Sequence, residues 1–294
     1  MAPVEHPVIV LLLILIVAGL VAAVLGGAYR WKKRTQALRA RLLRLGTPIA
    51  PAAYDSRELD GLPMPVQRYF RSALTEGQPI IAVARFNHTG TFNMGETTPN
   101  WRAFSSSQIV SDHGPGFVWD ARVAMAPGLR LFVHDAYVGG AGVLHAEVLG
   151  LMTVADEPDT PELAQGELMR YLAEAMWYPT ALLPSQGVRW TPLDESSARA
   201  TLTDGSTTVS LDFRFGQDGL IESSTAAARP RMLGGRAVTM PWTARAWAHD
   251  LRDGMRIPLE AEVSWIQQDG PYPYWRGRLT SIEYEYAPGG TDGG

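Results

Sequence analysis

Two hydrophobic patterns divide the chain. From Val8 to Ala28 every residue is apolar or small, whereas beyond Pro79 apolar residues recur at every second position. A helix over the first run would span about 32 Å, enough to cross the hydrocarbon core of a bilayer. The first pattern predicts a membrane-spanning helix within residues 1–29, and the second predicts a large strand-rich domain.

A cleaved signal peptide is the alternative interpretation of the apolar run. Signal peptides have a basic leader and a shorter apolar stretch. Here the leader MAPVEHP contains no Lys or Arg, and the run is longer than a signal peptide requires. We therefore expect a retained anchor whose partner is the lipid bilayer, contacted through Val8–Ala28.

A basic segment follows the apolar run directly. Its basic residues are Arg30, Lys32, Lys33, Arg34, Arg39, Arg41 and Arg44, and it contains no acid. Because basic flanks stay on the cytoplasmic side, the sequence predicts a single-pass protein of the inner or plasma membrane with a cytoplasmic domain. An extracytoplasmic domain is the alternative. Residues 30–61 are expected to form a basic juxtamembrane helix and a linker, the helix lying along anionic headgroups or acting as a plain stop-transfer flank.

Charge and composition exclude several classes of function. The basic segment carries +7, so the remainder of a chain with net charge −4 carries −11. An acidic body on a basic stalk does not suit nucleic acid, and no nucleic-acid partner is predicted. The absence of cysteine excludes disulfides, thiolate metal sites and cysteine nucleophiles.

Strict alternation marks the strands, most clearly over residues 117–125, 129–134, 209–215 and 257–265. Turn dipeptides separate the alternating runs: Gly139-Gly140, Asp204-Gly205, Asp218-Gly219, Gly234-Gly235, Asp253-Gly254 and Asp269-Gly270. This pattern predicts roughly ten to twelve antiparallel strands between Ile80 and Tyr286, in a sheet large enough to curl.

Two segments with helical spacing accompany the strands. One covers residues 65–75 and begins at Pro65; the other covers residues 162–177, with Thr160 as N-cap and Pro161 as first residue. The predicted fold is α+β and mainly β: an N-terminal transmembrane helix, then a large curved, half-barrel-like antiparallel sheet with one long packed helix. The domain should occupy residues 62–286, and the Gly-rich tail, 287–294, should be disordered.

Charged residues supply two candidate sites. Glu167, Arg170 and Glu174 share one helix face, where they would act as acid/base or substrate-clamping groups, or form ordinary surface ion pairs. The surface interpretation is favoured. Asp120 and Arg122 share the polar face of a strand, near histidines of the following strands, and would line a cavity or lie on a solvated sheet face. The solvated face is again favoured.

Aromatic residues supply a third candidate site, in the C-terminal third of the chain. Trp265 and Trp275 lie there among many tyrosines, with Arg276 and Arg278 following on the same strand. Such a group would form an aromatic pocket in which arginine binds an anionic head, or simply a well-packed sheet. No histidine pair has metal-ligand spacing, and no nucleotide-binding or nucleophile-elbow motif is present, so neither metal nor cofactor is predicted.

Four segments together resemble a known family: LPMPVQRYFRSAL (62–74), PGFVWDARVAM (115–125), GELMRYLAEAMWYPTALLPS (166–185) and YWRGRLTSIEY (274–284). They resemble an uncharacterised bacterial family of membrane-anchored proteins known only as a domain of unknown function. The resemblance covers about Leu62 to Tyr286. It implies a Trp-Gly-Arg sequence near PWTAR (241–245), where this chain has Ala244 instead of glycine and leaves the role of Arg245 open. At the level of fold alone, the expected sheet is similar to lipoprotein-carrier and lipid-binding half-barrels.

Three functional hypotheses follow from these features. The first is a membrane-tethered binding module for a small apolar or lipid-like ligand. The second is an enzyme using the carboxylate and arginine groups, although no catalytic motif identifies a reaction. The third is a protein-interaction scaffold at the membrane.

Overall fold

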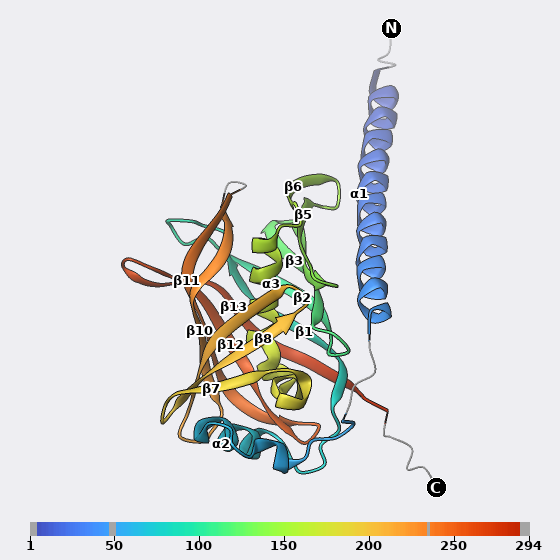
Figure 1. Ribbon diagram of the computed structural model, residues 1–294. Coiled ribbons are helices and arrows are strands. Elements are labelled where there is room, and N and C mark those ends of the chain that lie inside the picture. Colours follow the sequence, from blue (N-terminus) through green and yellow to red (C-terminus); the bar gives the residue numbers. More distant parts are fainter. Residues whose placement is uncertain (1–4, 47–50, 234–235, 289–294) are drawn as a thin grey trace.

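One antiparallel sheet makes up most of the chain beyond residue 80 (Figure 1). The computed structural model describes residues 5–46, 51–233 and 236–288. Within them the sheet has thirteen strands: β1 (Ile81–Asn93), β2 (Trp101–Ser111), β3 (Gly116–Ala126), β4 (Leu129–Val138), β5 (Ala141–Val148), β6 (Met152–Glu157), β7 (Arg189–Asp194), β8 (Ser197–Asp204), β9 (Thr207–Phe215), β10 (Ile221–Leu233), β11 (Arg236–Arg252), β12 (Met255–Gln267) and β13 (Gly270–Tyr286).

The strand order is β6-β5-β4-β3-β2-β1-β13-β12-β11-β10-β9-β8-β7. Consecutive strands pair as hairpins except β6 and β7, which form the two edges of the sheet, and the first and last strands join its two halves through the register Gly90↔Gly277. The predicted mainly β fold, with a curved antiparallel sheet, is confirmed. The expected strand number was too low, because short strands such as β6 (MTVADE) and β7 (RWTPLD) show little alternation.

Three α-helices and several short 3₁₀ turns complete the described chain. The helices are α1 (Glu5–Arg44), α2 (Met64–Ala73) and α3 (Pro161–Glu174). The 3₁₀ turns are Ser56–Leu59, Ala175–Trp177, Pro179–Leu182 and Pro184–Gln186. As predicted, Thr160 caps α3: its hydroxyl accepts a hydrogen bond from the Leu163 amide at 3.2 Å, satisfying a donor that the helix leaves free.

The main core lies between α3 and the concave face of the sheet. The turn after α3 is fixed by hydrogen bonds to the strands: the Trp177 indole donates to the Pro258 carbonyl at 2.9 Å, and the Tyr284 hydroxyl donates to the Trp177 carbonyl at 2.6 Å. The Tyr171 hydroxyl donates to Asp112 at 2.6 Å. These contacts hold α3 in one orientation, which determines which of its side chains face the sheet.

The convex face of the sheet is covered in part by the basic half of α1 (Figure 1). Trp31, Thr35, Leu38 and Leu42 follow one another at helical spacing, so they form a single stripe on α1. Leu42 packs with Val118 and other apolar side chains of this face in a second core. The segment predicted to follow anionic headgroups, or to be a plain flank, is therefore helical and packed on protein.

Two segments outside the sheet, the predicted linker and the predicted tail, also make contacts that the sequence did not predict. The expected linker before the domain contains the buried residues Tyr54 and Leu59, both of which belong to the core cluster. In the predicted tail, the Ala287 amide donates to the Ile80 carbonyl at 2.8 Å. The remainder of that prediction, 289–294, lies outside the described residues.

Candidate functional site

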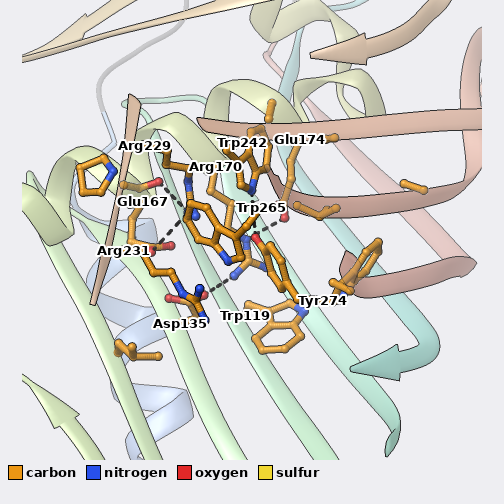
Figure 2. Close-up of a pocket in the computed structure, with 18 of the residues that line it drawn as sticks. Trp119, Asp135, Glu167, Arg170, Glu174, Arg229, Arg231, Trp242, Trp265 and Tyr274 are labelled. Atoms are coloured by element: carbon orange, nitrogen blue, oxygen red, sulfur yellow. Dashed lines mark hydrogen bonds and ion pairs between the residues drawn. The ribbon is translucent and has the colours of Figure 1, made fainter. Parts of the chain in front are cut away.

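A cavity of about 230 Å³ lies between α3 and the concave face of the sheet (Figure 2). Its wall is largely apolar and includes seven aromatic side chains, from both halves of the sheet and from the turn after α3: Phe92, Trp119, Trp177, Trp242, Trp265, Tyr274 and Trp275. Charged side chains also reach the wall: Asp135, Glu162, Glu167, Arg170, Glu174, Arg229 and Arg231. Such a combination of an apolar wall and a few polar groups is typical of a small-molecule site.

The positive charge of Arg170 is fully paired with carboxylates of the cavity wall. Its guanidinium hydrogen-bonds Asp135, and its Nε donates to Glu174 at 2.7 Å. The Gln108 amide donates to the other Glu174 oxygen at 2.5 Å. Burial alone would lower the pKa of Arg170, but the surrounding carboxylates, Glu174 first, raise it. Arg170 is therefore a permanent cation with two bound anions, and it organises the wall without adding net positive charge.

Glu167 is in the opposite situation. Its side chain is buried and its Oε2 has no hydrogen-bond partner among the described residues. Burial raises the pKa of Glu167 well above its usual value, and the neighbouring charge of Asp135 raises it further. Both effects favour the protonated form of this carboxyl group, which can donate a hydrogen bond.

Arg229 is the cation nearest to this neutral acid. One of its nitrogens lies 3.9 Å from Glu167 Oε1, beyond hydrogen-bond distance, while the same nitrogen donates to the Gly166 carbonyl at 3.0 Å. Its Nε is buried without a partner among the described residues. The guanidinium lies 5.3 Å from the ring centre of Trp242 and 5.4 Å from that of Trp265. Arg229 thus brings an incompletely matched positive charge into an aromatic cleft.

Arg231 adds a second such charge. It lies 5.2 Å from the ring centre of Trp265, and burial lowers its pKa. No ion pair of Arg231 is formed within the described part of the chain. Because Arg170 is paired with two carboxylates and burial disfavours a negative charge on Glu167, Arg229 and Arg231 make their end of the cavity positive.

The aromatic wall is rigid because its rings pack on one another. Trp265 and Tyr274 stack with ring centres 5.6 Å apart, and the Trp242 indole donates to the Tyr274 hydroxyl at 3.0 Å. Trp275 lies over Gly277, where an added Cβ would come within 2.1 Å of the indole. Glycine at this position therefore makes room for the ring, and the wall is shaped before any ligand binds.

The structure brings together five of the residues proposed from sequence. Glu167, Arg170, Glu174, Trp265 and Trp275 all line the cavity. The favoured interpretation of the first three as solvated surface ion pairs was wrong, because their helix face packs toward the sheet. Their burial, and the shifted pKa values of Glu167 and Arg170, distinguish them from a solvated helix surface.

The other three C-terminal candidates point away from the cavity. Arg245, Arg276 and Arg278 are exposed on the convex face, as alternation along β11 and β13 requires. Arg276 pairs with Glu262 at 2.6 Å, and Arg278 approaches Glu260 at 4.0 Å. Arg276 and Arg278 thus interact with carboxylates on the surface, and Arg245 is exposed there.

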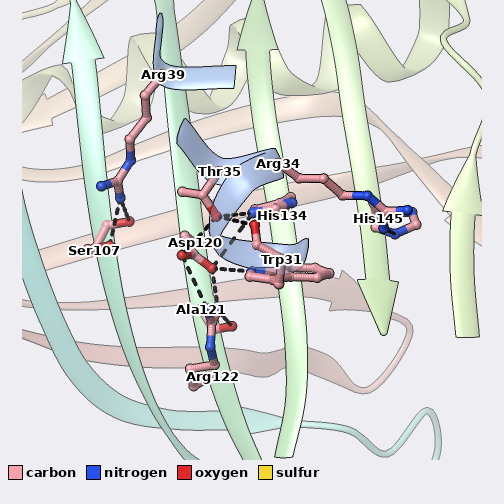
Figure 3. Close-up of polar contacts among 10 residues, drawn as sticks. All are labelled: Trp31, Arg34, Thr35, Arg39, Ser107, Asp120, Ala121, Arg122, His134 and His145. Carbon is pink, nitrogen blue, oxygen red and sulfur yellow. Dashed lines mark hydrogen bonds and ion pairs between the residues drawn. The ribbon is translucent and has the colours of Figure 1, made fainter. Parts of the chain in front are cut away.

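Asp120 and Arg122 occupy a different place, beneath α1 (Figure 3). Asp120, His134 and His145 form a row across β3, β4 and β5, in direct register. The Trp31 indole donates to Asp120 at 2.9 Å, and its ring stacks on His134 with centres 4.0 Å apart. These polar groups do lie together, as the less favoured interpretation proposed, but α1 covers them, so the solvated-face interpretation was wrong.

Burial under α1 has an electrostatic consequence. Thr35 Oγ1 lies 2.7 Å from His134 Nε2, and the histidine is almost fully buried. Burial lowers the pKa of His134 to about 4; the negative Asp120 opposes this shift, whereas Arg122, His145 and Arg34 add to it. His134 is therefore neutral when α1 is docked. Around it, Arg34 forms an ion pair with Glu147, and His145 lies 2.8 Å from Asp156.

Arg229 and Arg231 were missed by the sequence reasoning. The inward residues Ser224 and Ala226 predict that even-numbered positions of β10 face the core. A bulge between Ala226 and Arg229 changes this parity and turns the arginines inward. The only signal in the sequence is the triplet Arg229-Pro230-Arg231. Across the described residues, no group of three or more His, Cys, Asp or Glu side chains is placed to hold a metal ion.

Fold and site together define a class of protein: a curved antiparallel sheet that holds a helix-capped, aromatic cavity behind an N-terminal apolar helix. The chain belongs to the family of unknown function DUF6920, which matches residues 60–284. This match confirms the resemblance to an uncharacterised family. No curated protein matches the sequence.

Two solved structures are similar in fold. One is a LolA superfamily protein from Nitrosomonas europaea, with 9% sequence identity and a TM-score of 0.40, covering 76% of this chain and 93% of that chain. The other is a beta-barrel-like protein of domain of unknown function DUF1849 from Brucella abortus, with 11% identity and a TM-score of 0.19, covering 70% of this chain and 99% of that chain.

Proposed function

We propose that this protein is a membrane-tethered binding module for a small amphiphile with an apolar body and an anionic head. The observation that carries the proposal is the positive end of the aromatic cavity. Arg229 is buried there with an unpartnered Nε, and burial raises the pKa of the neighbouring Glu167 carboxyl group, which disfavours a compensating negative charge. A carboxylate or phosphate head would supply the missing acceptor, since hydrogen bonds between ionised groups are the strong ones.

The cavity also limits the size of the ligand. Its volume of about 230 Å³ lies below the usual range of about 300–1,000 Å³ for drug-sized ligands. It therefore suits a single acyl chain or a small ring system rather than both chains of a two-chain lipid. The packed indoles would contact the apolar body of the ligand, while Arg229 and Arg231 would hold its head.

The tether is the apolar half of α1. The described side chains of its apolar run are mostly exposed, and among the described residues this is the helix that is long and apolar enough to cross a membrane. The same helix continues into the segment docked on the sheet, with Trp31 fully buried. Removal of the apolar half as a signal peptide would cut this continuous helix, which supports a retained anchor. Single-pass insertion with a cytoplasmic domain is the topology that the basic flank favours.

Binding of a dansyl-labelled fatty acid to the full chain in detergent tests the proposal. Arg229→Met removes the charge but keeps much of the side-chain volume, so the carboxylate probe should bind roughly 10- to 100-fold more weakly, as expected for a lost ionised hydrogen bond of about 1.5–3 kcal/mol. Arg276→Met is the matched control, because Arg276 is exposed on the other face of the sheet.

The methyl ester of the same probe separates loss of the charge from loss of the fold. It should bind wild type and Arg229→Met equally well. If the carboxylate probe binds wild type and Arg229→Met with equal affinity, or does not bind wild type at all, the proposed ligand class is wrong.

An enzyme remains a second candidate because of one observation. Glu167 lines the cavity beside Asp135, and burial raises its pKa in the direction that a general acid requires. Glu167→Gln keeps a neutral hydrogen-bond donor but cannot transfer a proton. A binding module predicts an unchanged affinity for the fatty-acid probe in this variant, whereas an enzyme predicts that probe turnover, measured by mass spectrometry, occurs in wild type and disappears in Glu167→Gln.

A further inference from the structure

The hairpin formed by β5 and β6 lies directly against α1. Its turn and the helix approach so closely that a Cβ added to Gly27 would lie 2.6 Å from the Leu149 carbonyl oxygen, and one added to Gly150 would lie 2.6 Å from the Gly27 carbonyl oxygen. Arg30 also donates to the Gly150 carbonyl at 3.1 Å. Gly27 belongs to the apolar run Val8–Ala28, so the turn is fixed beside the apolar half of α1.

The exposed residues at this turn are apolar. Leu151, Met152 and Val154 have exposed fractions of 44%, 60% and 53%. They lie on or next to β6, the edge strand of the sheet, where soluble proteins usually place charged residues to prevent association. Leu129, on the neighbouring turn, is also exposed, and the Leu149 amide joins the two turns by donating to the Arg130 carbonyl at 2.9 Å.

The backbone conformation of the turn is unusual for the residues that occupy it. Leu149 has φ +54° and Gly150 has φ +67°. Turns of this left-handed kind favour Asn or Gly, and a leucine there is strained. In a turn exposed to water, nothing would offset this strain or the exposure of the apolar residues beside it.

We propose that the β5–β6 hairpin is embedded in the headgroup region of the same bilayer that α1 crosses, through Leu151, Met152 and Val154. The inference rests on the proposed membrane tether. Arg30, Lys32 and Lys33 follow the apolar run on α1 and would meet anionic headgroups at the same level. The hairpin is thus a second membrane contact, which fixes the orientation of the domain on its anchor.

This orientation directs the cavity toward the lipid. Phe92 and Arg231 lie near the ends of β1 and β10, Trp265 lies near the end of β12, and Tyr274 lies near the start of β13. Figure 1 shows the β5–β6 hairpin beside α1, and the upper ends of β10 and β11 reach a similar height on the far side of the sheet. Phe92, Arg231 and Tyr274 line the cavity and are partly exposed. The bound amphiphile would then enter from the leaflet rather than from water.

Single cysteines test the placement of the hairpin, because the chain has no cysteine of its own. Met152→Cys is compared with Met64→Cys, a site of equal exposure, 60% against 59%, on α2 at the other end of the domain. Each full-length variant carries an NBD label and is reconstituted into vesicles of phosphatidylcholine with a minority of phosphatidylglycerol, with and without lipids bearing a shallow nitroxide.

The label at position 152 should show blue-shifted emission and be quenched by the nitroxide lipid, whereas the label at position 64 should behave as in water. A label at 152 that is no more quenched than the label at 64 would overturn the inference. If such protein still resists extraction from the vesicles by alkaline carbonate, the tether stands and only the hairpin contact fails. Protein released by carbonate would instead refute the tether.

The entry route needs a separate measurement. In the combined variant Leu151→Ser, Met152→Ser and Val154→Ser, the dansyl fatty acid should transfer from vesicles to the protein several-fold more slowly. Its affinity for the same protein in detergent should be unchanged, because none of these residues lines the cavity. Equal transfer rates for the variant and wild type would contradict entry from the leaflet.

Discussion

Replacing Trp31 by alanine tests how strongly α1 is held on the sheet. The indole is fully buried, donates to Asp120 at 2.9 Å and stacks on His134. A buried tryptophan removes about 150–250 Å² from water, worth about 4–6 kcal/mol at about 25 cal/mol per Å². Partial relaxation around the deletion reduces this value, so we expect Trp31→Ala to cost about 3–5 kcal/mol of docking free energy. The loss cannot exceed the docking free energy itself.

The chemistry of a single buried thiol measures this loss. Val118 is completely buried beneath α1, so in Val118→Cys a maleimide reacts only when the helix leaves the sheet. Trp31→Ala in this background should increase the labelling rate by about 100-fold or more, at about 1.4 kcal/mol per factor of ten. Tyr29→Ala, at an exposed position of the same helix, should leave the rate unchanged.

A thiol on the other face distinguishes undocking from unfolding. Ala121 is equally buried but faces the main core, so Ala121→Cys should remain protected in the Trp31→Ala background. If Trp31→Ala accelerates labelling at position 121 as much as at position 118, the helix and the sheet unfold together. If it accelerates neither, the reasoning that Trp31 holds α1 is refuted.

Three further outcomes are expected. Gly277→Ala should lower the free energy of unfolding of the full chain in urea by about 1–3 kcal/mol, because the added Cβ would overlap the Trp275 indole. Gly114→Ala, with open space around the added Cβ, should change this free energy little. Equal effects of the two substitutions would contradict the role of Gly277. Docking of α1 should weaken as the pH falls from about 6.5 to about 4, because undocked His134 binds a proton at its ordinary pKa whereas the docked residue has a pKa lowered to about 4. The labelling rate of Val118→Cys, normalised to that of denatured protein at each pH, should therefore rise over this range. His134→Gln should flatten this pH dependence. Arg170→Met leaves two carboxylates without their cation in the cavity wall and should cost about 3–5 kcal/mol in urea unfolding, so a loss below about 1 kcal/mol would show that the network is not held as described.

The sequence by itself determined the elements and their faces. The apolar run predicts the long helix, alternation predicts the strands, and the Thr160-Pro161 pair predicts where α3 begins. These features depend on neighbours within a few residues, and so the local pattern is enough to identify them. The same is true of Arg276 and Arg278: alternation places them opposite Trp275, although the initial interpretation grouped them with the aromatic side chains.

Only the tertiary structure decided which faces meet. A bulge between Ala226 and Arg229 turns Arg229 inward, although the preceding alternation would place it outside. The ion pairs of Arg170 look like surface contacts along the helix until the sheet covers them. From the sequence alone, the polar row through Asp120 resembles a solvated face, whereas in the structure α1 packs on it. In each case the environment comes from residues far away in the chain, and burial by such partners sets both the pKa values and the charge of the cavity.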